Sequence, residues 1–162
     1  MIKLADDLKT FEFSKIGEFV LYQQDTLAIV LKSPSPLHNH DEMVYMWAIE
    51  EKKSVKAICY IGSTEKTLSK RCKQHEKRFI NTLLGKKSSQ RIVALLNRGK
   101  TVSIYARIPQ KVKCFGVIVS AHKTEETALI KRYCSAQPLL NKQGKKFNLH
   151  LEDLMSGIFP PF

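Results

Sequence analysis

The chain has 162 residues, enough for one ordinary domain but not for two. With 43% hydrophobic and 26% charged residues it can bury a core, which excludes wholesale disorder. Its longest apolar runs are of strand length, far short of the roughly 20 residues that span a bilayer. The first residues also lack the basic and apolar regions of a secretory signal, so we expect a soluble, cytoplasmic protein without a membrane partner.

Positive charge is concentrated in the larger, C-terminal part of the chain. Lysine and arginine number 27 against 15 acidic residues, a formal net charge of +12. Residues 1–40 hold only four lysines and five acidic residues, so residues 41–162 carry all of the excess. Such a charge is typical of proteins that bind nucleic acid, although a merely lysine-rich soluble surface is the alternative.

The cysteines show no metal-binding pattern. They are Cys59, Cys72, Cys114 and Cys134, and no two of them have a C-x-x-C spacing. No histidine pair lies near them at zinc-finger spacing. We therefore expect reduced, mostly buried thiols and no structural zinc site.

A proline-rich break divides the chain near residue 36. Residues 33–36 read Ser-Pro-Ser-Pro, which forces an extended connection. We therefore delimit an N-terminal extension, residues 1–40, which can pack on the rest through apolar side chains. These are Phe11, Phe13, Ile16, Phe19 and Val20.

A hairpin and a helix are predicted directly after this break. Residues 43–49 and 55–61 are apolar, aromatic and β-branched and are joined by polar residues, which predicts a β-hairpin. Helical spacing follows over about 66–84, with Gly85 as the predicted C-terminal stop. The apolar face of this predicted helix consists of Leu68, Cys72, Phe79 and Leu83.

Helices and strands alternate in the remainder. The pattern predicts a helix from about Ser88 to Asn97, strands at 101–108 and 115–120, and a helix at 124–136. The fold class is therefore α+β: a small antiparallel sheet made of the hairpin and a third strand, flanked by helices. We expect a core at 41–145, with an inserted helix–strand segment at about 84–112, and a tail at 146–162.

Several polar side chains fall where a plain core would not place them. Arg71 and His75 are four residues apart, so they share a helix face close to the apolar stripe. Glu126 has Leu129, Ile130 and Tyr133 at +3, +4 and +7, so it lies on the buried face of its predicted helix. An arginine or a carboxylate at such a position calls for a charged partner or ligand.

Each of these residues also has an ordinary structural interpretation. Tyr45 and Tyr60, taken singly, are typical sheet tyrosines, and Arg71 can serve a salt bridge. His75 can be a packed helix residue, and Glu126 can be a first-turn acid facing the helix dipole. Their functional interpretation rests on their joint occurrence and order.

In that order they resemble the signature of the GIY-YIG nucleases. The matching elements are Tyr45, Tyr60-Ile61-Gly62-Ser63, Arg71, His75, Glu126-x-x-Leu129-Ile130-Lys131 and Asn141. The first triplet is degenerate, since Met43-Val44-Tyr45 keeps only the tyrosine. Arg71 and Glu126 are 55 positions apart, which resembles the small standalone type II restriction endonucleases of this family.

The resemblance implies a role for each residue in phosphodiester hydrolysis. Tyr45 is implied as general base, which requires nearby positive charge to lower its pKa. Tyr60 or His75 would orient Tyr45 or relay its proton, and Arg71 would hold the scissile phosphate. The resemblance leaves open whether Tyr60 or His75 takes the proton.

The resemblance also implies a metal cofactor. Glu126 would bind one Mg²⁺ or Mn²⁺ in each active site, because a single carboxylate leaves positions for water and phosphate oxygens. Asn141 would fix the local geometry.

Basic residues crowd the stretch 66–100, which suits a surface that follows a DNA backbone. Gln90 and Arg91 are candidates for adenine and guanine contacts. A solvated basic face is the alternative. The predicted DNA-binding residues are Lys70, Lys73, Lys86, Lys87, Ser88, Gln90 and Arg91.

The leading hypothesis is therefore a metal-dependent, site-specific double-stranded DNA endonuclease of restriction type. Cutting both strands with one active site per chain suggests a homodimer, and restriction requires a cognate DNA methyltransferase. One alternative is a structure-specific repair, recombination or homing nuclease. Another is a catalytically inert nucleic-acid-binding module.

Overall fold

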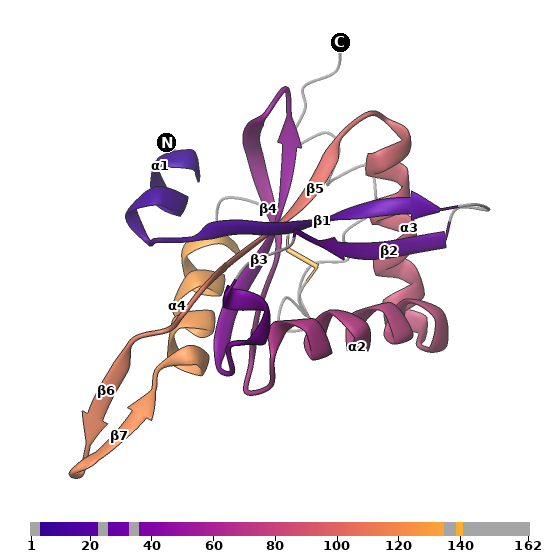
Figure 1. Ribbon diagram of the computed structural model, residues 1–162. Coiled ribbons are helices and arrows are strands. Elements are labelled where there is room, and N and C mark those ends of the chain that lie inside the picture. Colours follow the sequence, from indigo (N-terminus) through magenta and orange to yellow (C-terminus); the bar gives the residue numbers. More distant parts are fainter. Residues whose placement is uncertain (1–3, 23–25, 33–35, 135–138, 141–162) are drawn as a thin grey trace.

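A five-stranded antiparallel sheet forms the centre of the molecule in the computed structural model, which describes residues 4–22, 26–32, 36–134 and 139–140 (Figure 1). Its strand order is β2-β1-β5-β3-β4, and a separate two-stranded sheet contains β6 and β7. The strands are β1 (Ser14–Tyr22), β2 (Thr26–Leu31), β3 (Met43–Glu51), β4 (Ser54–Thr64), β5 (Thr101–Arg107), β6 (Lys111–Cys114) and β7 (Val117–Ser120). The α+β class is confirmed.

Helices cover both faces of the central sheet. They are α1 (Leu4–Thr10), α2 (Leu68–Asn81), α3 (Leu83–Asn97) and α4 (His122–Cys134), with a 3-10 turn, η2, at Pro36–Asn39. Apolar residues of α2 and α3 share one core with the sheet, and those of α1 and α4 share the other. Within the described residues, no helix has both the length and the apolar character needed to cross a bilayer.

The predicted hairpin is present as β3 and β4. Every residue of β3 from Met43 to Glu50 is buried, because this strand has neighbours on both sides and helices on both faces. Its odd-numbered side chains pack toward α2 and α3, and its even-numbered ones toward α1 and α4. The turn residues Lys52 and Lys53 both have positive φ, as a two-residue hairpin requires.

The prediction of one helix over 66–84 is wrong in its C-terminal part. The helix α2 ends at Asn81, and α3 starts at Leu83, a residue that is 74% exposed. Gly85 therefore lies inside α3 and does not stop α2. A Cβ on Gly85 would lie 1.9 Å from the carbonyl oxygen of Arg78, so the sharp junction of the two helices requires glycine there.

The sheet has five strands instead of three because residues 14–31 contribute two of them. β1 pairs with β5 and β2 pairs with β1, both antiparallel. Phe13, Ile16 and Phe19 are buried, as predicted for the N-terminal segment.

The strand predicted at 115–120 is half of a second hairpin. β7 covers only Val117–Ser120 and pairs with β6, which was not predicted. Phe115 and Gly116 form the turn between them, both with positive φ. Phenylalanine is rare at positive φ. Because Phe115 is apolar, the sequence pattern predicted a strand where the turn lies.

Polar contacts tie α1 to α4. The carboxylate of Asp7 accepts hydrogen bonds from Arg132 Nε and Nη2, each at 3.0 Å, and from Tyr133 Oη at 2.9 Å. The hydrogen bond from Arg132 lowers the pKa of Asp7. These bonds fix the C-terminal half of α4 against the N-terminal helix.

The four cysteines are free thiols in different surroundings. Cys59 and Cys72 are buried, and burial raises the pKa of each to about 12. Cys134 is half-buried and Cys114 is exposed next to the turn of the second hairpin.

Candidate active site

Tyr45 lies at the centre of a buried polar network. β3 places its side chain on the face covered by α2, where only 1% of the residue is exposed. Its Oη lies 2.7 Å from Nε2 of His75 and accepts a hydrogen bond from Nε of Arg71 at 3.0 Å. Arg71 also donates from Nη1 to Oε1 of Gln74 at 3.2 Å, which orients the guanidinium. Arg71 and His75 reach the same phenol because they are one helical turn apart.

Gly62 is required by the position of Tyr45. The two residues are directly opposite each other in the β3–β4 register. A Cβ on Gly62 would lie 2.6 Å from Oη and 2.7 Å from Cζ of Tyr45, closer than van der Waals contact allows. The glycine of the Tyr60-Ile61-Gly62 triplet thus leaves space for the phenol of Tyr45.

Aromatic contacts hold Tyr60 beside this network. Its ring stacks on Trp47 with centroids 4.2 Å apart and an interplanar angle of 25°. It also meets the His75 ring edge-on, with centroids 5.4 Å apart, and stacks on the Tyr45 ring with centroids 6.0 Å apart. Trp47 is not among the predicted site residues. The available signal was its position two residues after Tyr45, which puts both on the same face of β3.

Burial determines the protonation states of His75 and Tyr45. It lowers the pKa of His75 to about 3, and the positive charges of Arg71 and Arg78 act in the same direction. His75 is therefore neutral near pH 7 and is able to accept a hydrogen at Nε2.

The pKa of Tyr45 is raised well above its usual value. Burial is the largest cause and Tyr60 adds to it, while Arg71 acts in the opposite direction. The expectation that positive charge gives Tyr45 a lowered pKa is thus wrong for the free protein. Tyr45 is a protonated phenol there, because the loss of hydration outweighs the attraction of a single guanidinium.

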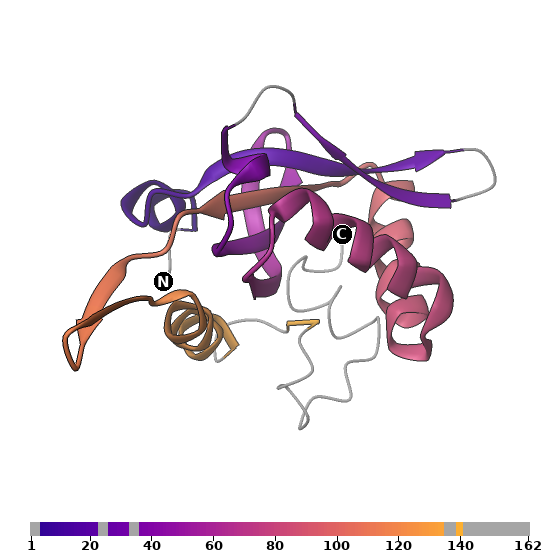
Figure 2. The same cartoon turned by 60° about the horizontal axis from the view of Figure 1, so that its bottom comes forward.

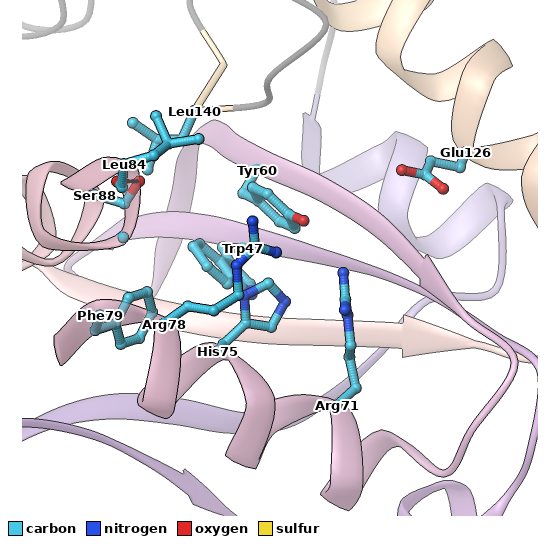
Figure 3. A pocket seen from close by; sticks show the side chains of 11 residues that line it. Trp47, Tyr60, Arg71, His75, Arg78, Phe79, Leu84, Ser88, Glu126 and Leu140 are labelled. Carbon is cyan, nitrogen blue, oxygen red and sulfur yellow. Dashed lines mark hydrogen bonds between the residues drawn. The ribbon is translucent and has the colours of Figure 1, made fainter. Parts of the chain in front are cut away.

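A cavity of about 290 Å³ opens beside this network and brings Glu126 to it (Figure 3). Tyr60, Arg71 and His75 line one side, and Glu126 enters from α4 on the other. Ser63 at the end of β4 donates to Oε2 of Glu126 at 2.5 Å and holds its carboxylate in place. The other lining residues are Trp47, Arg78, Phe79, Leu84, Gly85, Ser88 and Leu140.

The neighbouring carboxylate of Glu125 points elsewhere. Its Oε1 accepts the backbone N–H of Gln110 at 2.7 Å, and its Oε2 lies 3.5 Å from Nε of Arg107. Glu125 therefore fastens α4 to the end of β5, which leaves Glu126 as the acid that faces the cavity.

Arg78 lines the cavity although it is not among the predicted site residues. It follows Arg71 by seven residues, two helical turns, and so lies on the same face of α2. Its side chain extends into the cavity toward Tyr60 in Figure 3. No carboxylate within the described parts of the chain forms an ion pair with it. Two arginines and one carboxylate thus face the same space.

The donors around the cavity suit one hard divalent cation. Glu126 supplies a carboxylate whose second oxygen is not engaged by Ser63. Mg²⁺ is commonly held by one or two carboxylates, with water and phosphate oxygens as its remaining ligands. No group of three His, Cys, Asp or Glu side chains suited to a metal occurs among the residues that the structure describes. A metal held by Glu126 would therefore rely on substrate and water.

The remaining predicted residues are placed as follows. Ser88 lines the cavity, and Arg91 is half-buried on α3. Lys70, Lys73, Lys86, Lys87 and Gln90 are exposed on α2 and α3. Asn141 lies outside the described residues, although its neighbour Leu140 lines the cavity and donates its backbone N–H to Cys59 O at 2.6 Å.

The fold of this chain is similar to that of a solved protein structure. The structure of a mutant of bacteriophage T4 EndoII matches it with a TM-score of 0.58 and 21% sequence identity, over 82% of this chain and 96% of that one. Restriction endonuclease HPY188I in complex with product DNA matches with a TM-score of 0.44 and 19% identity, over 81% and 79% of the two chains. No protein-family model and no curated protein matches the sequence.

Proposed function

We propose that the protein is a metal-dependent DNA endonuclease that hydrolyses phosphodiester bonds in double-stranded DNA. The observation that carries this proposal is the shared cavity: Arg71 and His75, which both contact the buried Tyr45, line one side and Glu126 lines the other. The nuclease-like fold and the positive charge of residues 41–162 support it.

In the proposed reaction, arginines bind the phosphate and a phenol handles the proton. Arg71 and Arg78 face the cavity and bind oxygens of the scissile phosphate. Tyr45 takes a proton from the attacking water at Oη while its own proton passes to Nε2 of His75, 2.7 Å away. Because Tyr45 is only 1% exposed, this step requires Arg71 to shift toward the phosphate and uncover the phenol oxygen.

Glu126 is the proposed ligand for one Mg²⁺ or Mn²⁺, with Ser63 holding its carboxylate. When bound, such an ion neutralises charge on the phosphate and stabilises the leaving oxygen. We assign Asn141 a supporting role in the local geometry.

Within this class, we propose a restriction type of activity, with a homodimer that supplies one active site for each strand. The proposed DNA contacts are the predicted residues Lys70, Lys73, Lys86, Lys87, Ser88, Gln90 and Arg91. A cognate methyltransferase would protect the host site. A structure-specific repair, recombination or homing nuclease, or an inert binding module, would share the fold without this activity.

The test is incubation of the purified protein with an unmethylated phage genome and Mg²⁺, beside the Glu126→Ala variant. Discrete fragments from the wild type alone are the expected result, and the fragment ends identify the target site. Absence of cutting with Mg²⁺ and with Mn²⁺ would contradict the restriction activity. Branched and single-stranded DNA would then separate a structure-specific nuclease from a binding module.

A further inference from the structure

The cavity beside the Tyr45 network has two unlike ends (Figure 3). Arg71 and Glu126 line one of them, which we call the charged end. Phe79, Leu84 and Leu140 line the other, which we call the apolar end. The proposed hydrolysis takes place at the charged end and gives the apolar end no role.

Three separate segments of the chain build the apolar end. Phe79 comes from α2, Leu84 from the first turn of α3, and Leu140 from residues 139–140, which lie between α4 and α3 (Figure 2). Phe79 and Leu140 are buried, whereas Leu84 is 40% exposed and marks where the cavity opens. The backbone N–H of Leu140 donates to Cys59 O at 2.6 Å, which attaches its segment to β4. The apolar end is therefore a wall that the fold positions, and not a patch on the outer surface.

An aromatic ring, a guanidinium and a hydroxyl complete the lining. Tyr60 lines the cavity and is only half-buried, and the stack on Trp47 holds its ring. Arg78 extends into the cavity toward Tyr60. Ser88 lies at the apolar end, where its Oγ donates to Leu84 O at 3.0 Å. The lone pairs of this hydroxyl can still accept an N–H from a ligand.

We propose that the apolar end binds one nucleobase that has left the base stack, with the phosphate of the same nucleotide at the charged end. This inference rests on the proposed action on DNA and specifies the form in which the substrate enters the site. Proteins hold a flipped base by stacking it on aromatic and apolar side chains and by hydrogen bonds to its polar edge. Tyr60, Phe79 and Leu140 supply the first kind of contact, and Ser88 supplies the second.

The charges and the size of the cavity favour this occupant. An apolar molecule without a phosphate would leave Arg71 and Arg78 without an anionic ligand, and a phosphate ion alone would leave the apolar end unfilled. A nucleotide suits both ends, because its sugar joins an aromatic base to a phosphate. The volume of about 290 Å³ lies at the lower limit for small-molecule sites, so the cavity suits one nucleotide and excludes a base pair with its stacked neighbours.

Fluorescence of Trp47 tests the site, because this residue is the single tryptophan of the chain and lines the cavity. The probes are thymidine 5′-monophosphate, deoxyribose 5-phosphate and inorganic phosphate, each titrated in the absence of metal. We expect thymidine monophosphate to change the Trp47 emission in a saturable way. It should bind roughly fivefold or more tightly than deoxyribose 5-phosphate, which is the contribution of stacking by one base. Equal affinities for these two probes, or no saturable change with either, would overturn the base site.

Leu84→Gln and Leu83→Gln are the matched variants. Both replace a leucine in the first turn of α3, but Leu83 is 74% exposed and does not line the cavity. We expect Leu84→Gln to bind thymidine monophosphate roughly fivefold more weakly and to keep its affinity for inorganic phosphate, because it loses only apolar contact with the base. Leu83→Gln should bind both probes as the wild type does. Equal affinities of all three proteins for thymidine monophosphate would contradict the site.

These titrations do not use cleavage, so the base site and the nuclease can fail separately. Base-dependent binding in a protein that cuts no DNA would support the site and contradict the proposed function. Cutting of DNA without base-dependent binding would support the proposed function and overturn the site. Circular dichroism should show the same folded state for the two variants and the wild type, since both substituted side chains are at least 40% exposed.

Discussion

Tyr45 Oη lies 2.7 Å from Nε2 of His75, a residue 30 positions later on a different element. The contact brings together a phenol with a raised pKa and an imidazole with a lowered one, both because they are buried. Tyr60, the other candidate partner, also hydrogen-bonds to Tyr45 and helps to raise its pKa. The pair is therefore the part of the site where substitution is most informative.

The first prediction concerns Tyr45→Phe, which keeps the ring and removes Oη. We expect cleavage to fall roughly 10²–10⁴-fold, the usual value of a general base. The free energy of unfolding should fall by about 1–3 kcal/mol, because Arg71 and His75 lose a buried partner. Initial-rate assays and urea denaturation measure the two effects.

Tyr105→Phe is the matched control. Its hydroxyl donates to Oε1 of Glu50 at 2.7 Å, away from the cavity. It should lower stability to a similar extent and leave cleavage unchanged. Equal loss of cleavage in both variants would show that Tyr45 acts only through stability.

Glu126→Gln should greatly slow cleavage while DNA binding remains. The amide keeps the shape of the carboxylate but loses the negative charge that would hold the metal ion, so we expect a loss of roughly 10²–10⁴-fold. Glu125→Gln, one residue earlier, should keep activity and change stability by about 1 kcal/mol or less, since it loses only the ion pair with Arg107. Gel-shift and nicking assays on one DNA fragment compare the variants. Activity in Glu126→Gln equal to that of Glu125→Gln would contradict the assignment of the metal ligand.

Arg78→Gln should weaken cleavage more than Lys77→Gln, which removes the same charge at the neighbouring position. A charged hydrogen bond to phosphate contributes about 1.5–3 kcal/mol, which corresponds to roughly 10–150-fold in cleavage efficiency. Lys77→Gln removes one positive charge from an exposed position outside the cavity and should cost about threefold or less. The comparison is made at several salt concentrations, because only a general loss of charge is masked by added salt. Equal losses of cleavage efficiency in the two variants would show that Arg78 contributes only to the overall positive charge of the protein.

Acid should destabilise the protein through His75. Its pKa is about 3 in the folded protein against 6.5 in the unfolded chain, so below about pH 6.5 only the unfolded chain takes up this proton. The free energy of unfolding should fall by up to about 1.4 kcal/mol per pH unit between about pH 6.5 and about pH 3. His75→Gln removes this contribution, so its stability should depend less on pH across that window. Parallel pH dependence in urea denaturation of the two proteins would contradict the buried, neutral state of His75.

Local patterns in the sequence predicted the elements that carry the site. The β3–β4 hairpin follows from two apolar runs around a polar turn, and the shared face of Arg71 and His75 follows from helical spacing. Trp47 and Arg78 were not predicted as site residues, although the same periodicities place them on the site face. A tryptophan in a buried strand is equally typical of a hydrophobic core, and an arginine on a helix is equally typical of a solvated face.

Contacts distant in sequence could not be predicted in this way. The pairing of β1 with β5 joins segments about 90 residues apart, and nothing local in either strand specifies its neighbour. The junction of α2 and α3 at Thr82 was not predicted, because Gly85, which close packing requires, resembles a glycine that ends a helix. The raised pKa of Tyr45 depends on how completely the surrounding elements exclude water, a property of the assembled fold.

The hydrogen bonds from Arg132 and Tyr133 to Asp7 have a practical consequence for Glu126, the carboxylate that faces the cavity. Glu126 lies six residues before Arg132 on α4, so the alignment of α4 over the cavity depends on an anchor near the start of the chain. A protein shortened to begin at β1 would keep all strands of the central sheet and every motif residue, yet lose this anchor. The position of Glu126 is thus coupled to a helix that carries no signature of its own.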